Sequence, residues 1–168
     1  MSQTENKGSL ISSEAYEKID KWIARYPADK RQSALIPALS IVQEMCGNGS
    51  LSTELMDEMA AYIGIPEIAV YEVASFYSMY ELEPVGRNMV AVCTNISCML
   101  CGGEEIVQHI EDKYGVKIGG TTADGKFTLK QEEECLAACA GAPMMTVNGH
   151  YHEKLTLEKV DSIIEGLK

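Results

Sequence analysis

Two closely spaced cysteine pairs are the residues of this chain best suited to metal chemistry. Cys93 and Cys98 are separated by four residues, and Cys135 and Cys139 are separated by three. Thiolate sulfur is a soft ligand, and a [2Fe–2S] cluster takes two thiolates on each of its two irons. Four cysteines that arrive as two pairs therefore predict an iron–sulfur centre.

A further cysteine, Cys101, leaves other assignments open. With Cys93 and Cys98 it forms the C-x4-C-x2-C spacing of plant-type ferredoxins, which one distant cysteine would complete. Cys98 and Cys101 also form a CxxC motif, which is typical of thiol–disulfide exchange in a thioredoxin-like protein. Structural zinc on the two pairs is a third alternative, although zinc sites more often use CxxC spacings. The choice of ligands therefore decides between electron transfer, dithiol chemistry and a structural metal.

The elements expected to position the first pair are a strand and a helix. The apolar run 89–93 predicts a buried strand that ends at Cys93, and the apolar spacing over 104–114 predicts a helix. Cys98 is expected in the loop between them. Ligands of α/β proteins gather at this edge of the sheet, just beyond the carboxyl ends of the strands.

The elements that follow complete a small α/β unit. A short strand is expected at 127–129, and Asn148-Gly149 predicts a type I′ hairpin between strands at 144–147 and 150–152. A last helix is expected to begin at Thr156. Strand, helix and strand followed by a hairpin and a helix describe a thioredoxin-like layout.

The first half of the chain has only helical periodicity. Four helices are expected: one from Ser13 that Pro27 ends, then 32–45, then Ser52 to Gly64, then 67–80. Short helices with short connections form a small bundle. The predicted organisation is a disordered tail (1–9), a helical bundle (10–80), a linker (81–88) and a thioredoxin-like [2Fe–2S] domain (89–168). In the fourth helix, four side chains at helical spacing are expected in the core, with contact to another protein as the alternative for part of this surface: Phe76, Tyr77, Met79 and Tyr80.

Composition narrows the classes of partner. Lys and Arg number 14 against 25 Asp and Glu, and the resulting net charge of −11 argues against nucleic-acid binding. No apolar run approaches the roughly 20 residues that span a bilayer. We expect a bacterial-type cytoplasm, where reduced thiols make the six cysteines better candidates for metal ligands than for disulfides.

Several segments together resemble the E subunit of NADH–quinone oxidoreductase, in the respiratory complex I family. They are 75–80 with 84–87, Cys93-x4-Cys98, 134–139 with 142–145, and 151–156. The resemblance covers about residues 10 to 168. It implies an N-terminal helical region and a thioredoxin-like ferredoxin domain, with one [2Fe–2S] cluster on Cys93, Cys98, Cys135 and Cys139. Cys101 would then be a bystander.

Two positions depart from the pattern of that family. The segment 46–49, which includes Cys46, stands where the family commonly has an Arg-Gly-aromatic stretch, and Ala137 stands where glycine is frequent. The first departure affects the helical region, and the second affects how one backbone amide approaches the cluster. Neither replaces an expected ligand.

The resemblance implies an electron-transfer role without a catalytic residue. The chain would dock on the FMN- and NADH-binding subunit of the same complex, and its cluster would exchange single electrons with the FMN. The chain has no GxGxxG fingerprint and no Walker-type loop, so it is expected to bind neither NADH nor FMN itself. The expected location is peripheral, on the cytoplasmic face of the bacterial inner membrane, with membrane association only through the complex.

Two alternatives remain open from the sequence. The same kind of subunit serves NAD-linked hydrogenases and formate dehydrogenases, and the sequence does not separate these settings. The other alternative belongs to a different class, a thiol–disulfide oxidoreductase that uses Cys98 and Cys101.

Overall fold

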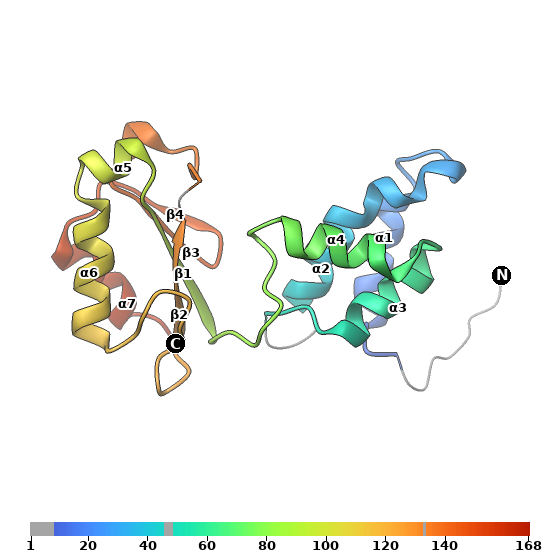
Figure 1. Cartoon of the computed structure of the whole chain (residues 1–168), viewed down its shortest axis with the longest axis horizontal. Coiled ribbons are helices and arrows are strands. Elements are labelled where there is room, and N and C mark those ends of the chain that lie inside the picture. The colour runs from blue at the N-terminus through green and yellow to red at the C-terminus, as the bar shows by residue number, and fades with distance from the viewer. Residues whose placement is uncertain (1–8, 46–48, 133) are drawn as a thin grey trace. The chain divides into compact units, whose positions relative to one another are not determined.

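The chain divides into two compact units, Met1–Pro84 and Val85–Lys168 (Figure 1). The computed structural model describes residues 9–45, 49–132 and 134–168, so most of the expected disordered tail, and also Cys46, lie outside the described residues. The first unit is helical and the second is a mixed helix and sheet unit, which confirms the predicted fold class. No helix within the described ranges is long and apolar enough to cross a membrane.

In the part of the first unit that the structure describes, four α-helices form a bundle. They are α1 (Ser13–Ile23), α2 (Leu35–Met45), α3 (Thr53–Ile63) and α4 (Glu67–Phe76), with a 3-10 segment (Ala28–Ala34) before α2. The side-chain oxygens of Ser12 and Ser52 accept hydrogen bonds from backbone amides of the first turns of α1 and α3, at 3.2 and 3.3 Å. These caps explain why both helices begin where the sequence predicts.

The end of α4 differs from the prediction. The helix stops at Phe76 rather than near Tyr80, because Tyr77 adopts an extended conformation with φ −90° and ψ 120°. Phe76, Tyr77 and Met79 are exposed, so their expected place in the core was wrong. Tyr80 is buried, and its hydroxyl donates to the Ile36 carbonyl oxygen at 2.7 Å. This contact favours an extended path after the helix over another helical turn.

The second unit is built on a four-stranded sheet. Its elements are β1 (Asn88–Cys93), α5 (Ile96–Leu100), α6 (Gly103–Tyr114), β2 (Phe127–Glu132), a 3-10 turn η2 (Cys139–Gly141), β3 (Met145–Val147), β4 (His150–His152) and α7 (Leu157–Glu165). The strand order is β2-β1-β3-β4, with β1 parallel to β2 and antiparallel to β3, and β3 antiparallel to β4. The two central positions of the sheet are therefore β1 and β3, the strands that flank the cysteine segments.

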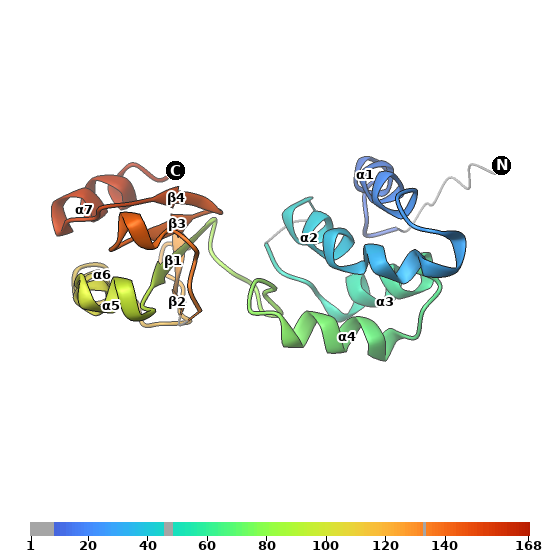
Figure 2. The same cartoon turned by 90° about the horizontal axis from the view of Figure 1, so that it is seen from above.

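Helices α6 and α7 lie side by side on one face of this sheet, as both views show (Figures 1 and 2). Asp161 of α7 joins them: it contacts the His109 Nε2 at 2.8 Å and the Lys113 Nζ at 3.0 Å, and accepts from the Tyr114 hydroxyl at 3.2 Å. Side chains from the strands and these helices form the core between the layers: Val90, Val92, Ile106, Ile110, Phe127, Leu129, Met145, Val160 and Ile164. This second core is separate from that of the helical bundle.

The hairpin between β3 and β4 confirms its sequence signal. Asn148 and Gly149 both have positive φ, 50° and 78°, as a type I′ turn requires. The Asn148 side chain also reaches β1, where its Oδ1 accepts from the Met89 backbone amide at 2.8 Å. The hairpin is therefore tied to the central strand at the end opposite the cysteines.

Candidate metal centre

The first cysteine pair lies at the end of the central strand. Cys93 is the last residue of β1, as predicted, and its backbone amide donates to the Met144 carbonyl oxygen at 3.2 Å. Cys98 lies in α5, a five-residue helix where the sequence predicted a loop. Both side chains are buried, with relative exposures of 2% and 1%. Five residues carry little more than one turn of apolar spacing, which is too short a pattern to predict a helix.

Gly103 lets α6 begin directly against these two residues. A Cβ atom at position 103 would lie 2.8 Å from the Cys93 carbonyl oxygen and 2.9 Å from that of Cys98. Both distances are well inside van der Waals contact, so any larger residue would push the helix away. Gly102, in the left-handed conformation with φ +91°, makes the turn between α5 and α6.

The thiols of the first pair interact. Burial raises the pKa of the Cys98 thiol to about 11, and its hydrogen bond with Cys93 and the nearby Cys139 act in the same direction. The neutral thiol is therefore the form of Cys98 that this environment favours in the cluster-free chain. Met144 is buried beside both sulfurs and completes a small apolar cluster at this edge of the sheet.

The second pair is close together and open to solvent. Cys135 and Cys139 are both exposed, and their sulfurs lie 3.2 Å apart. Between them, Ala137 adopts φ +62°, and its backbone amide donates to the Cys135 sulfur at 3.3 Å. Amide hydrogen bonds of this kind stabilise negative charge on a sulfur. The sequence marked this position only as an alanine where glycine is frequent.

The segment of the second pair packs over the first pair. Leu136, Ala138 and Ala142 lie against the cluster that contains Cys93 and Cys98. The four cysteines expected as ligands thus lie at one edge of the sheet. Cys93 and Cys98 form a buried pair, and Cys135 and Cys139 form an exposed pair. Among the described residues, no three His, Cys, Asp or Glu side chains converge closely enough to enclose a single metal ion.

Cys101 occupies a different position from these four. It follows α5 directly and is exposed, and its backbone amide donates to the Cys98 carbonyl oxygen at 3.1 Å. Cys98 and Cys101 thus face different environments, one buried and one open to solvent.

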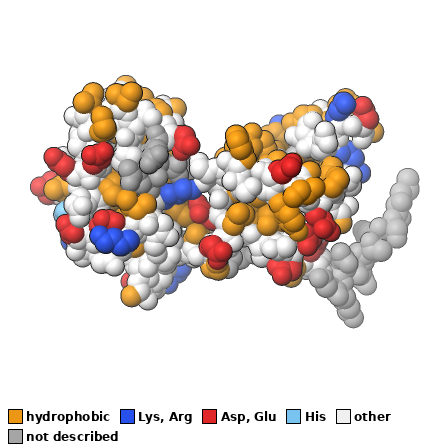
Figure 3. Space-filling view, viewed as in Figure 1, with side chains coloured by type: hydrophobic (Ala, Val, Ile, Leu, Met, Phe, Trp, Pro, Cys, Tyr) orange, Lys and Arg blue, Asp and Glu red, His pale blue; other side chains and the backbone are white. Residues whose placement is uncertain are grey.

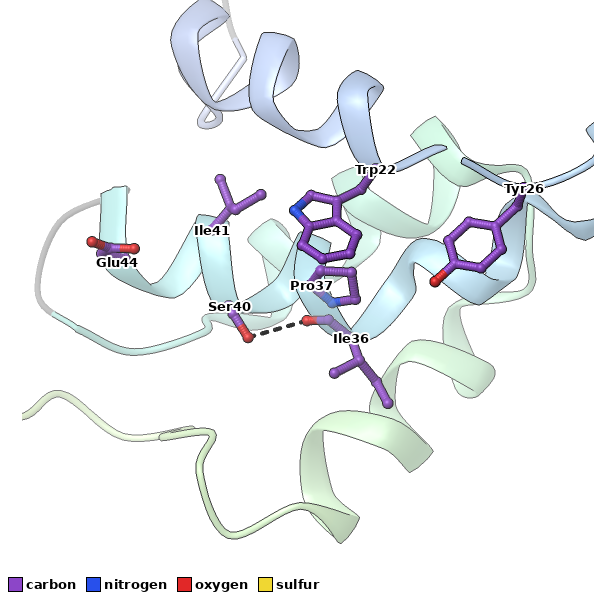
Figure 4. Close-up of a pocket in the computed structure, with 7 residues that line it drawn as sticks. All are labelled: Trp22, Tyr26, Ile36, Pro37, Ser40, Ile41 and Glu44. Atoms are coloured by element: carbon purple, nitrogen blue, oxygen red, sulfur yellow. Dashed lines mark hydrogen bonds between the residues drawn. The ribbon is translucent and has the colours of Figure 1, made fainter. Parts of the chain in front are cut away.

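The helical unit contains a shallow hollow of about 460 Å³ (Figure 4). It is lined by Trp22, Tyr26, Ile36, Pro37, Ser40, Ile41 and Glu44. The Ser40 hydroxyl donates to the Ile36 carbonyl oxygen at 3.2 Å, so this polar side chain is already engaged. The hollow is predominantly apolar and offers none of the thiol chemistry found in the second unit.

Comparisons with known proteins place the chain among iron–sulfur proteins. The family model of the thioredoxin-like [2Fe-2S] ferredoxins matches residues 19–168. An NADH-quinone oxidoreductase E subunit of Rhizobium meliloti is 41% identical over 152 residues, which cover 90% of this chain and 88% of that protein. The mitochondrial NADH dehydrogenase [ubiquinone] flavoprotein 2 of Dictyostelium discoideum is 44% identical over 90% of this chain, and the match spans 60% of its length.

Solved structures show the same fold at lower identity. An NAD+-reducing [NiFe]-hydrogenase in the air-oxidized state superposes with a TM-score of 0.64 over 78% of this chain and 22% of the hydrogenase chain, at 20% identity. The same type of enzyme in the H2-reduced state gives a TM-score of 0.58 at 23% identity. At these identities the likeness concerns the fold alone.

Proposed function

The chain belongs to the thioredoxin-like [2Fe-2S] ferredoxin family that includes the E subunit of NADH–quinone oxidoreductase, and from this premise we propose that it is the electron-transfer subunit of such an oxidoreductase. The observation that supports the proposal is the packing of the segment that carries Cys135 and Cys139 over the buried pair Cys93 and Cys98, through Leu136, Ala138 and Ala142. Thiolates presented as two pairs suit a [2Fe–2S] cluster, because each iron takes two of them.

The residues of this edge have separate tasks in holding such a cluster. Cys93 and Cys98 supply the buried pair of ligands, and Cys135 and Cys139 supply the pair nearer the solvent. The Ala137 amide stabilises the charge of the Cys135 sulfur, and Met144, buried in the same cluster, makes a backbone hydrogen bond to the Cys98 thiol. When bound, the cluster supplies one-electron redox chemistry.

The hydride chemistry belongs to a partner in this proposal. FMN and NADH bind to another subunit of the same complex, and this chain exchanges single electrons with the FMN without a catalytic residue of its own. Its place is peripheral, on the cytoplasmic face of the bacterial inner membrane, and it reaches the membrane only through the complex. An NAD-linked hydrogenase or formate dehydrogenase could use the same kind of chain; genes for membrane-arm subunits beside this one would favour the quinone-reducing complex.

Iron and sulfide analysis combined with EPR spectroscopy after dithionite reduction tests the proposal. The wild-type protein is expected to hold two irons and two sulfides and to give an S = 1/2 signal on one-electron reduction. Cys101→Ser is expected to keep this signal, whereas Cys139→Ser should lose or alter it. Loss of the signal in Cys101→Ser would support the plant-type spacing instead. A colourless protein that reduces protein disulfides through Cys98 and Cys101 would contradict the proposal.

A further inference from the structure

Helix α5 turns large apolar side chains toward the solvent. Ile96 and Leu100 have relative exposures of 68% and 77%, and Met99 is also exposed. They occupy positions i, i+3 and i+4, so they share one face of the helix, while Cys98 of the same helix is buried. We call Ile96, Met99 and Leu100 the α5 face. Figure 3 shows hydrophobic side chains gathered at this end of the second unit, where Figure 1 places α5.

The α5 face is not needed to complete the core of its unit. That core is formed by strand, α6 and α7 side chains, and none of the α5 face residues belongs to it. Single exposed apolar residues are ordinary on protein surfaces, but a contiguous group is typical of a contact with another protein. This group sits beside the candidate cluster ligands, since Cys98 lies within the same five residues.

Carboxylates lie in the first turn of α6, next to the α5 face, and at the cysteine loop. Glu104 and Glu105 are exposed in the first turn of α6, and the Glu105 carboxylate lies beside Gly102, 3.5 Å from where a Cβ would be. Across the cysteine loop, Glu134 is exposed and the Glu153 side chain packs against Gly141. The basic Lys154 lies at the same edge, where its amide donates to the Gly141 carbonyl oxygen. The α5 face is thus an apolar group followed directly along the chain by two exposed carboxylates, Glu104 and Glu105.

We propose that the α5 face is the docking surface for the flavin-bearing subunit, through an apolar patch of that subunit flanked by basic side chains. The inference rests on the proposed function and deepens it by assigning the contact to particular residues. A partner seated on α5 covers the edge of the sheet where the exposed Cys135 and Cys139 lie, which brings its redox group toward the cluster and removes water from the contact. An apolar centre with a charged rim is the usual anatomy of a protein interface, and the two carboxylates that follow α5 select a basic partner.

The test measures binding of the cluster-loaded chain to the FMN-loaded flavin subunit from the same organism, by isothermal titration calorimetry. Ile96→Glu and Leu100→Glu are each expected to weaken the affinity by about 30-fold or more, because a carboxylate would be buried at the centre of the contact. Ile118→Glu is the matched control. Ile118 is also an exposed isoleucine, but it follows the far end of α6, a helix about 18 Å long. The control should bind as the wild type does.

A second set of variants tests the carboxylates that follow α5 without touching α5. Glu104→Lys should slow association several-fold and reduce its dependence on salt, because rim charges act mainly on the encounter rate. Asp112→Lys makes the same charge change near the other end of α6 and should leave the rate near the wild-type value. If Leu100→Glu also disturbs the EPR signal of the cluster, the comparison of Glu104→Lys with Asp112→Lys alone decides whether the α5 face is the docking surface.

The outcomes separate the docking surface from the proposed function. If the wild type binds the flavin protein and accepts its electrons while Ile96→Glu and Leu100→Glu bind equally well, the docking proposal is wrong and the function stands. If the cluster-loaded wild type neither binds the flavin protein nor is reduced by NADH in its presence, the docking proposal and the proposed function are both wrong. If Leu100→Glu abolishes only self-association of the isolated chain, the α5 face joins two copies of this chain and the proposal is overturned.

Discussion

Replacing Ala137 by glycine is expected to stabilise the protein, although Ala137 touches the candidate cluster site. Ala137 has φ +62°, in the left-handed region. This conformation costs a non-glycine residue about 1–2 kcal/mol, which Ala137→Gly would remove. Glycine also increases the conformational entropy of the unfolded chain, and this lowers the free energy of unfolding by about 0.4–1 kcal/mol. The net gain is about 0.8 kcal/mol in the free energy of unfolding, which raises the Tm of a unit of this size by about 4 °C.

Gly115 offers a matched reverse experiment in the same unit. It ends α6 with φ +63°, and a Cβ atom added there would meet no other atom within 4 Å. Gly115→Ala therefore changes the backbone preference alone, and it should lower the free energy of unfolding by about 0.8 kcal/mol. The two substitutions exchange the same residue types at nearly the same φ.

Urea unfolding of the cluster-free, reduced chain followed by circular dichroism measures both changes. The single tryptophan, Trp22, lies in the helical unit, so its fluorescence reports the other unit and serves as an internal reference. The amide of residue 137 is kept in Ala137→Gly, so the loaded variant should retain its iron content and EPR signal. If Gly115→Ala destabilises as expected but Ala137→Gly does not stabilise, the left-handed conformation at 137 is not a source of strain.

Three further predictions follow from the contacts of the second unit. In the cluster-free protein, iodoacetamide at pH 8 should modify the exposed cysteines first, and Cys93 and Cys98 only after unfolding. Both of these side chains are buried, and the pKa of the Cys98 thiol is raised. Equal rates of labelling at all cysteines, measured by mass spectrometry of the peptides, would contradict this. Gly103→Ala should destabilise the unit by about 2 kcal/mol or more and reduce the iron content, because the new Cβ would lie 2.8 Å from the Cys93 carbonyl oxygen. An unchanged melting curve together with an unchanged iron content would disprove this close packing. Burial raises the pKa of Asp161, but hydrogen bonds from His109 and Lys113 outweigh this effect and hold the pKa below its ordinary value. The ionised carboxylate therefore stabilises the fold at any pH above its unfolded pKa. This stabilisation is lost as the pH falls through the folded pKa. Asp161→Asn should therefore lower stability by about 1 kcal/mol at pH 7 and by less at pH 3, and an equal loss at both pH values would refute the assignment.

Much of the fold could be predicted from local signals that need no tertiary context. Ser52 caps α3, Gly64 ends it with φ +84°, and Asn148-Gly149 makes the hairpin turn, all as the residue types indicate. The signals that failed are those overridden by distant contacts. Helix α4 has no glycine or proline to mark its end at Phe76, and the path beyond it depends on contacts that Tyr80 makes with α2.

The candidate site was predicted in its residue types but not in its asymmetry. Spacing left Cys101 open as a ligand, and the resemblance to the family implied the set Cys93, Cys98, Cys135 and Cys139. The burial of one pair and the exposure of the other depend on how the loop packs against the sheet, which neither signal reveals. The left-handed conformation of Ala137 runs against its intrinsic preference, so no local rule could have predicted it. The α5 face was missed because the helix is only five residues long.

The central place of β1 has a consequence for biosynthesis. Its neighbours, β2 and β3, both come later in the chain, as does the loop that covers Cys93 and Cys98. During translation, which adds about 5–20 residues per second, the first two cysteines leave the ribosome several seconds before their strand can be paired on either side. They remain open to oxidants and stray metal ions throughout that interval. With the proposed ligands, a cluster can be completed only after Cys135 and Cys139 have also emerged, which would make cluster insertion a late step of folding.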